Sequence, residues 1–155
     1  MERAEIAFVD TNVLLSATDS ARTDHGAARA VFEKAIGAGV HLAISGQIIR
    51  EYLVVATRPV AANGLGMQPI DAVRNADIFQ HRTLLLEETE AVADRLRILV
   101  ESYSLKGTRI HDANLCAVMQ VHGISQLVTQ NGSDFEPFAE VHALSPEAFE
   151  AELPV

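Results

Sequence analysis

Four acidic side chains lie at or near the boundaries between the predicted helices and strands: Asp10, Glu51, Asp112 and Asp134. Carboxylates that are brought close together raise one another's pKa and repel, so a group of four without a basic neighbour requires cations to hold it together. Oxygen ligands favour Mg²⁺ or Mn²⁺ over zinc, and the 6 histidines show no paired spacing that would indicate zinc. If the fold gathers the four acids, they predict a magnesium or manganese site.

Each of these acids also has an interpretation that involves no function. Asp10 opens the stretch Asp10-Thr11-Asn12 after the apolar run 6–9, and such residues cap helices by accepting bonds from backbone N–H groups. Asp112 falls in the first turn of a predicted helix, where the helix dipole favours an acid. Glu51 lies beside an apolar helical stripe, a normal place for glutamate, and turn chemistry alone explains the residues that precede Asp134. The four acids are therefore informative only together.

The hydrophobic pattern predicts the elements that must position these side chains. Alternating and continuous apolar runs indicate strands, and apolar residues at helical spacing indicate helices between them. Asp24 and Ser45 are expected to cap the helices that follow them, and Tyr103 is expected to face inward. The predicted strands cover residues 6–9, 40–44, 83–86, 124–128 and 141–144, and the predicted helices begin near residues 13, 25, 46, 69, 89, 110 and 146.

This alternation predicts an α/β fold, with a central parallel sheet and helices on both of its faces. In such a sheet ligands bind outside the carboxyl ends of the strands. Asp10 and Asp134 follow strands directly, and Asp112 begins the helix that leads into the fourth strand. Glu51 lies about one and a half turns into the helix after the second strand. All four acids can therefore reach one end of the sheet.

Length and composition favour a single globular domain over residues 1–155. The chain has 155 residues, 48% of them hydrophobic, and the charged start 1–5 is not followed by a long apolar segment. No membrane span is therefore expected. The single cysteine, Cys116, falls inside a helical pattern, so we expect it to pack in the core of a protein from a reducing compartment such as the cytoplasm.

The net charge of −9 argues against a general nucleic-acid-binding protein, because only 12 lysines and arginines are available for phosphate contacts. It does not exclude an enzyme that acts on nucleic acid, since bound cations can hold a phosphate backbone. Arg50, Arg58, Lys106 and Arg109 are candidates for a basic rim around such a site, although exposed basic residues are usually ordinary surface charges.

In order and spacing, Asp10-Thr11-Asn12, Glu51, Asp112-Ala113 and Thr129-x-Asn131-x-x-Asp134-Phe135 resemble the PIN-domain ribonucleases. As a small single-domain protein, the chain resembles the VapC-type toxins of bacterial toxin–antitoxin modules. The match spans residues 6–144. The resemblance implies a three-layer PIN-like fold in which the four acids bind metal and catalyse. Thr11, Asn12, Thr129 and Asn131 would then orient the acids, the substrate or a water molecule. Asn114 and Cys116 depart from the aliphatic or small residues expected in that helix.

These features lead to the hypothesis of a Mg²⁺- or Mn²⁺-dependent endoribonuclease. By resemblance, its partners are an RNA substrate, a cognate antitoxin protein and a second copy of the chain, with contacts expected over residues 58–82. The alternative is a non-catalytic PIN-fold module that binds RNA or serves as a scaffold, although a scaffold has no reason to keep four repelling acids. A phosphoryl-transfer enzyme of the haloacid dehalogenase type would need a second aspartate where Asn12 stands, and a response-regulator receiver domain would need paired acids early and a lysine late in the chain.

Overall fold

The computed structural model describes residues 4–154, so residues 1–3 of the charged start, and residue 155, lie outside the described part. Its centre is a five-stranded sheet in the order β3-β2-β1-β4-β5, in which every pair of neighbouring strands is parallel. This confirms the predicted parallel sheet, and the strand positions agree with the prediction to within two residues at each end. The strands are β1 (Glu5–Val9), β2 (Val40–Ser45), β3 (Leu84–Leu86), β4 (Gln126–Val128) and β5 (His142–Leu144).

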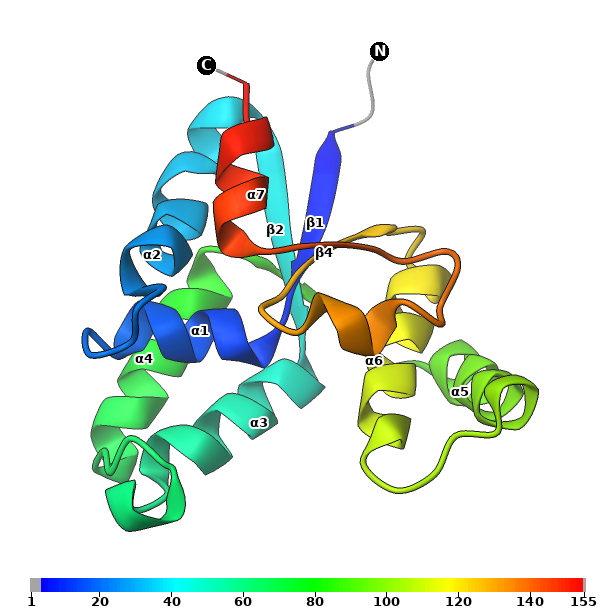
Figure 1. Cartoon of the computed structure of the whole chain (residues 1–155), viewed down its shortest axis with the longest axis horizontal. Helices are drawn as coiled ribbons and strands as arrows, with labels where there is room; N and C mark the ends of the chain where they lie inside the picture. The colour runs from blue at the N-terminus through cyan, green and yellow to red at the C-terminus, as the bar shows by residue number, and fades with distance from the viewer. Residues whose placement is uncertain (1–3, 155) are drawn as a thin grey trace.

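Helices cover both faces of this sheet. Figure 1 shows α5 and α6 on one side of β1 and β2, and α1, α2, α4 and α7 on the other. The three-layer α/β fold is therefore confirmed. The α-helices are α1 (Thr11–Thr18), α2 (His25–Lys34), α3 (Gly46–Thr57), α4 (Pro69–His81), α5 (Glu90–Tyr103), α6 (Arg109–Val121) and α7 (Pro146–Glu152), and the short 3₁₀ segments are η1 (Ile36–Ala38), η2 (Val60–Ala62) and η3 (Gly132–Phe135).

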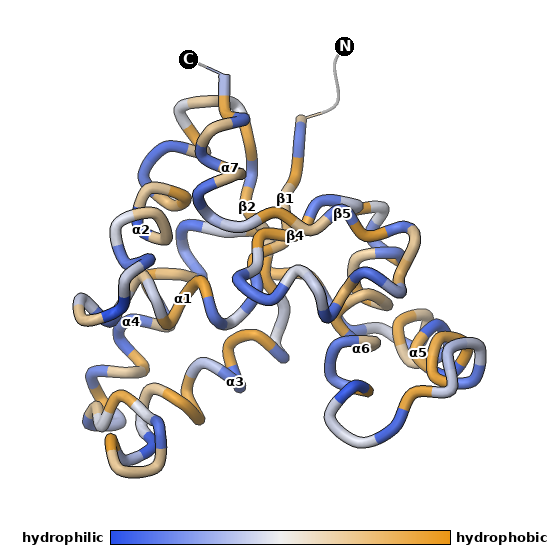
Figure 2. Tube along the Cα trace, in the orientation of Figure 1, coloured by the Kyte–Doolittle hydropathy of each residue, from blue (hydrophilic) through white to orange (hydrophobic). Residues whose placement is uncertain are grey.

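The buried hydrophobic residues form one cluster between the sheet and its helices. Ala7, Phe8 and Val9 in β1 are all fully buried, as expected for a central parallel strand covered on both faces. Figure 2 shows hydrophobic residues gathered where β1, β2 and β4 meet. Cys116 is also fully buried, which confirms that it packs in the core, and this burial raises the pKa of its thiol to about 12.

Three local predictions differ from the structure. Asp24 is at the N-cap position of α2 as predicted, but it makes no capping bond, because its φ and ψ of −94° and 9° are not those of an extended cap and its carboxylate accepts a bond from the Gln130 side chain. Ser45 precedes α3 in an extended conformation but makes no capping bond, and its buried hydroxyl has no hydrogen-bond partner within residues 4–154. Tyr103 is 41% exposed, because its ring packs on Phe138 at the edge of the core, with 5.2 Å between centroids.

A membrane-crossing segment would need a long, strongly apolar helix. Within residues 4–154 the structure contains no helix with that combination of length and hydropathy.

Candidate active site

The pairing of β1 with β4 places Asp10 at the centre of the candidate site. Val9 lies opposite Val128 in the parallel register, and the backbone N–H of Asp10 donates to the Val128 carbonyl over 3.0 Å. Asp10 is also the N-cap of α1, and its Oδ1 accepts a bond from the backbone N–H of Thr11 over 2.7 Å. The capping interpretation is thus correct for one oxygen of this carboxylate and leaves the other to be explained.

The second oxygen of Asp10 is held by Thr129, a buried residue directly after β4. Thr129 Oγ1 donates to Asp10 Oδ2 over 2.8 Å, and it accepts bonds of 3.1 Å from Asn12 Nδ2 and from the backbone N–H of Asn131. Because a hydroxyl has one proton and two donors already point at this oxygen, its proton must face Asp10. Asn12 is fixed in turn, since its Oδ1 accepts a 3.1 Å bond from the backbone N–H of Gln130. This network orients the Asp10 carboxylate.

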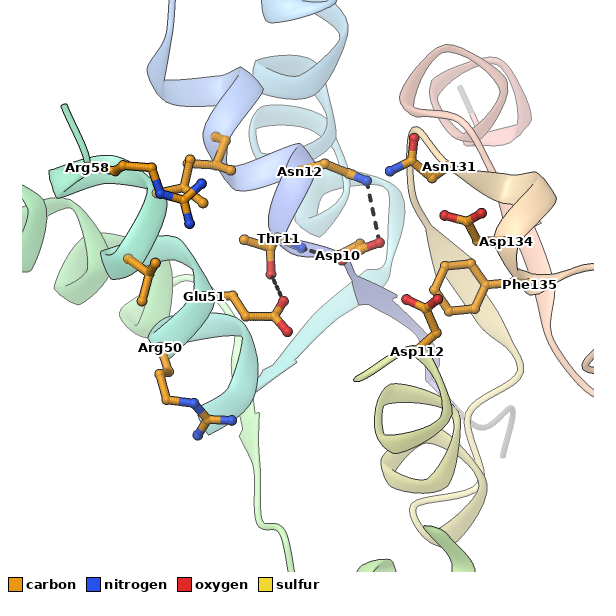
Figure 3. Close-up of a pocket in the computed structure, with 13 residues that line it drawn as sticks. Asp10, Thr11, Asn12, Arg50, Glu51, Arg58, Asp112, Asn131, Asp134 and Phe135 are labelled. Carbon is orange, nitrogen blue, oxygen red and sulfur yellow. Dashed lines mark hydrogen bonds between the residues drawn. The ribbon is translucent and has the colours of Figure 1, made fainter. Parts of the chain in front are cut away.

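Glu51 reaches the same place from α3. Its Oε2 accepts a 2.7 Å bond from Thr11 Oγ1, and its Oε1 accepts a 2.9 Å bond from Gln47 Nε2. Figure 3 shows Glu51 and Asp10 on either side of Thr11, which links the two acids through its backbone and its side chain. Glu51 therefore points into the site and is not an ordinary glutamate on the flank of a helix.

Asp112 and Asp134 approach Asp10 from the opposite side, and Arg109 lies beside both. Arg109 donates to Asp112 Oδ2 over 2.9 Å, and the same guanidinium nitrogen lies 3.9 Å from Asp134 Oδ1. The four acids were expected to lack a basic counterweight, and that expectation was wrong. Asp112 and Arg109 are three residues apart on α6, so one helical turn brings the charge and its counter-ion together.

Burial and neighbouring charges shift the pKa of two of these acids. Burial raises the pKa of Asp10 to about 6; the hydrogen bonds from Thr129 and Thr11 oppose the rise, while the charges of Glu51 and Asp112 add to it. Burial also raises the pKa of Asp112, the Arg109 guanidinium lowers it, and the charge of Asp134 raises it further. The site therefore disfavours the ionised form of Asp10, mainly because the carboxylate is removed from solvent.

The four acids share one cleft with a volume of about 430 Å³. Figure 3 shows Asp10 in the middle, with α3 and Glu51 on one side and Asp112 and Asp134 on the other. Thr129 bonds Asp10 but does not itself line the cleft. Lys106 is exposed and does not line the cleft either. The remaining lining residues are the polar Thr11, Asn12 and Asn131, the basic Arg50 and Arg58, and the apolar Leu15, Val54, Val55 and Phe135.

The acids line the cleft but are not drawn into a tight group. Over residues 4–154, no three acidic, histidine or cysteine side chains form an arrangement that could hold a metal ion. The hydrogen bonds explain this spacing, because donors from α1 and α3 hold both oxygens of Glu51, and Arg109 holds an oxygen of Asp112. Coordination of one ion by several of these acids thus requires side-chain movement.

Sequence reasoning missed one buried polar residue of this site, Gln47. It is 2% exposed and bonds Glu51, the His111 carbonyl and Asn114. Two signals pointed to it: Gln47 precedes Glu51 by four residues, which places both on one helical face, and Asn114 departs from the aliphatic residues expected in its helix. Asn114 Nδ2 donates to Gln47 Oε1 over 2.6 Å, so the unexpected residue is the partner of the missed one.

The chain belongs to the PIN-domain family, whose family model matches residues 7–141. It is similar to ribonuclease VapC24 of Mycobacterium tuberculosis, with 24% identity over 134 residues, which cover 84% of this chain and 89% of that protein.

Solved structures show the same fold at low sequence identity. One is Mycobacterium tuberculosis VapC20, described as a sarcin–ricin loop cleaving toxin, with a TM-score of 0.64, 20% identity, and 88% of this chain and 98% of that chain covered. Another is VapBC2 of Rickettsia felis bound to a promoter DNA fragment, with a TM-score of 0.65, 16% identity, and coverage of 90% and 98%.

The raised pKa of Asp10 predicts how stability depends on pH. Because the folded state holds this proton more tightly than the unfolded state does, ionisation of Asp10 destabilises the wild type as the pH rises from about 4 to about 6. This loss should reach no more than about 3 kcal/mol by pH 7. Asp10→Asn should remove it and leave only a pH-independent offset from the altered bond to Thr129. Urea denaturation in EDTA from pH 4 to 7.5 measures the difference.

Asp94→Asn on α5 is the matched control, because Asp94 is exposed and pairs only with Arg97 among the described residues. This control should keep the wild-type pH dependence. If Asp10→Asn keeps it as well, Asp10 does not ionise in the buried environment described above.

Proposed function

We propose that this protein is a Mg²⁺- or Mn²⁺-dependent endoribonuclease, the toxin of a toxin–antitoxin module. The observation that carries the proposal is the convergence of Asp10, Glu51, Asp112 and Asp134 on one cleft at the carboxyl ends of β1 and β4, in a chain of the PIN-domain family. The sequence relatives named ribonuclease and the structural relatives described as toxins support the assignment. The activity is hydrolysis of an RNA phosphodiester bond.

The chemistry of the donor set fits a hard divalent cation. The cleft offers carboxylate oxygens, with amide and hydroxyl oxygens beside them. Asp10 is largely buried and bonds no lysine, arginine or histidine within residues 4–154, so a cation beside it would offset the cost of its charge. Asp10 and Asp112 would hold the principal ion, and Glu51 and Asp134 would complete the site. When bound, such an ion supplies Lewis-acid activation of water and neutralises phosphate charge.

The protein's own side chains orient the reacting groups. Thr129 and Asn12 hold the Asp10 carboxylate in one orientation, and Thr11 holds Glu51. The Asn131 side chain lines the cleft near Asp134, where it would orient the attacking water. Hydrolysis adds this water to phosphorus in line with the bond that breaks; the water loses a proton and the departing ribose oxygen gains one.

Two arginines, Arg50 on α3 and Arg58 at its C-terminal cap, provide contacts for the rest of the RNA strand. Arg50 and Arg58 line the cleft, and within residues 4–154 neither forms an ion pair. They are eight residues apart, which is about 12 Å along the axis of α3, since Arg58 directly follows the last helical residue. Val54, 50% exposed, lies between them. This stripe places two free positive charges beside the acids, where neighbouring phosphates of a bound strand would lie.

The expected protein partners would use a different surface. Val60 on η2 and Ile70, Val73 and Ile78 on α4 are each at least half exposed, within the stretch 58–82 that the sequence analysis selected. Exposed apolar residues of this kind mark protein contacts when they lie close together. Similar structures include antitoxin complexes from Rickettsia felis and Klebsiella pneumoniae. We therefore propose an antitoxin and a second copy of the chain as partners.

RNA cleavage tests the proposed function directly. Wild-type protein should cleave a mixed RNA pool in Mg²⁺ or Mn²⁺, lose this activity in excess EDTA and recover it when the cation is restored. Asp10→Asn should be inactive under all these conditions, since it removes a charged ligand without changing shape. Gel analysis of the RNA measures both effects.

Two outcomes would contradict this proposal. Cleavage that persists in excess chelator would exclude the metal-dependent mechanism. RNA binding by the wild type without cleavage in any divalent cation would favour the non-catalytic PIN-fold alternative.

Arg58→Gln and Arg50→Gln should weaken RNA binding more than they slow cleavage. Each phosphate contact that is lost should raise KM and reduce the dependence of log affinity on log salt by roughly 0.7 for a single strand. Arg95→Gln is the control, because Arg95 is an exposed arginine of α5 that forms no ion pair within residues 4–154. Equal KM values and salt slopes for all three variants would exclude the α3 stripe from the RNA path.

The purified protein should form a dimer with about twice its chain mass of 16.8 kDa. Val73→Glu should shift it towards the monomer, because it places a charge in the exposed apolar face of α4. Gln80→Glu adds the same charge at an exposed polar position of α4 and serves as the control. Light scattering at micromolar concentration measures the mass, and a wild type found only as the monomer would contradict the dimer.

A further inference from the structure

Gln47 lies outside the acid cluster, yet its hydrogen bonds run into it. It is the second residue of α3, 2% exposed, and its amide nitrogen donates to Glu51 Oε1 over 2.9 Å and to the His111 carbonyl over 3.0 Å. Its amide oxygen accepts a 2.6 Å bond from Asn114. Both protons of the amide nitrogen are used. If the amide group were rotated by 180°, its oxygen would face two acceptors, Glu51 Oε1 and the His111 carbonyl, so that orientation is excluded. Gln47 thus has one allowed orientation.

These bonds join the two walls of the cleft. Glu51 is carried by α3, whereas His111 and Asn114 belong to α6, the helix that carries Asp112. Figure 3 shows that α3 and α6 approach the cleft from opposite sides. Because His111 immediately precedes Asp112, the bond to its carbonyl holds the α6 turn that presents Asp112.

Asn114 anchors this bridge from behind. Its amide nitrogen also donates to Glu88 Oε1 over 2.9 Å, in the segment between β3 and α5. The two protons of Asn114 are therefore shared between Gln47 and Glu88, which limits rotation of both amides. The chain of bonds runs from Glu88 through Asn114 and Gln47 to Glu51, and Thr11 holds the other oxygen of Glu51.

We propose that Gln47 is a positioning residue of the active site, which fixes the Glu51 carboxylate and sets its place relative to Asp112. This proposal rests on the proposed nuclease function, because Glu51 and Asp112 matter as a pair only if both serve the same reaction. A neutral amide suits the role, since it supplies one donor to the Glu51 carboxylate and one to the His111 carbonyl without the charge that a lysine would add. Partners of this kind that lie behind metal-binding side chains commonly change metal affinity or activity by about 10- to 100-fold when they are removed.

The central experiment is a double-mutant cycle between Gln47→Leu and Glu51→Gln, measured as single-turnover RNA cleavage with enzyme in excess. Leucine keeps the buried volume close to that of glutamine and removes both donors. Gln47→Leu should lower the maximal rate about 10- to 100-fold with little change in RNA affinity. In the Glu51→Gln background the same substitution should have a much smaller further effect, because Gln47 acts largely through Glu51 and only the loss of its bond to His111 remains.

Two further variants separate positioning from loss of fold. Ile48→Val removes a methyl group from the neighbouring fully buried residue of α3 and should lower Tm while leaving the cleavage rate unchanged. Asn114→Leu keeps both bonds that Gln47 donates, so it should reduce the rate in the same direction but by less than Gln47→Leu. If Gln47→Leu does not fold, Asn114→Leu tests the bridge alone, and a wild-type rate for that variant would overturn the proposal.

A readout independent of cleavage is the rise in Tm caused by millimolar Mn²⁺. Binding to the native state raises Tm, so a displaced Glu51 should make this rise smaller in Gln47→Leu than in Ile48→Val. If the wild type cleaves RNA and Gln47→Leu matches Ile48→Val in both rate and Mn²⁺ effect, the positioning proposal fails and the nuclease function stands. If the wild type does not cleave RNA, the proposed nuclease function fails. In that case an equal rise in Tm with Mn²⁺ for Gln47→Leu and Ile48→Val would overturn the positioning role as well. If Gln47→Leu and Glu51→Gln lower the cleavage rate by independent factors that multiply in the double mutant, the positioning proposal is also overturned.

Discussion

The buried carboxylate of Asp10 is the constraint on which the rest of the site depends. The parallel register of β1 and β4 brings it beside Thr129, and the start of α1 supplies a backbone donor to its other oxygen. These bonds offset only part of the cost of burying a charge, as the raised pKa of Asp10 shows. The ionised form of Asp10 is thus disfavoured in the folded protein, which is the expected pattern when a side chain serves chemistry.

Capping and function are not alternatives at this position. Asp10 caps α1 with one oxygen, and the other belongs to the network of Thr129 and Asn12. Helix capping fixes the backbone around the acid, so the same interaction that starts α1 also aims the second oxygen. Structural and functional interpretations of a residue can therefore both be correct when its side chain has two independent acceptors.

The sequence predicted the elements well, because strand and helix periodicity is local and the apolar runs of β1 and β2 are strong. It also placed the four acids at one end of the sheet, since that follows from topology. It did not predict Gln47 as the bridge between α3 and α6, because a side-chain bond over 64 residues leaves little local pattern. The pairing of Arg109 with Asp112 is local, but the three-residue spacing alone does not distinguish a counter-ion from a solvated surface charge. Asp24 and Ser45 occupy the predicted N-cap positions, but neither side chain makes a capping bond. For Asp24 the reason is a long-range contact, because its carboxylate bonds Gln130, 106 residues away.

The pairing of Arg109 with Asp112 has a consequence for how the cleft can change shape. Both residues lie in the first turn of α6, one helical turn apart. A shift of this turn towards Asp10 would therefore carry a positive and a negative charge together. The electrostatic work of narrowing the cleft is then much smaller than for a bare carboxylate, because the two fields largely cancel at a distance beyond their own separation. Asp112 can therefore move towards or away from Asp10 with little electrostatic work. Packing and hydrogen bonds, more than charge repulsion, then set the width of the cleft.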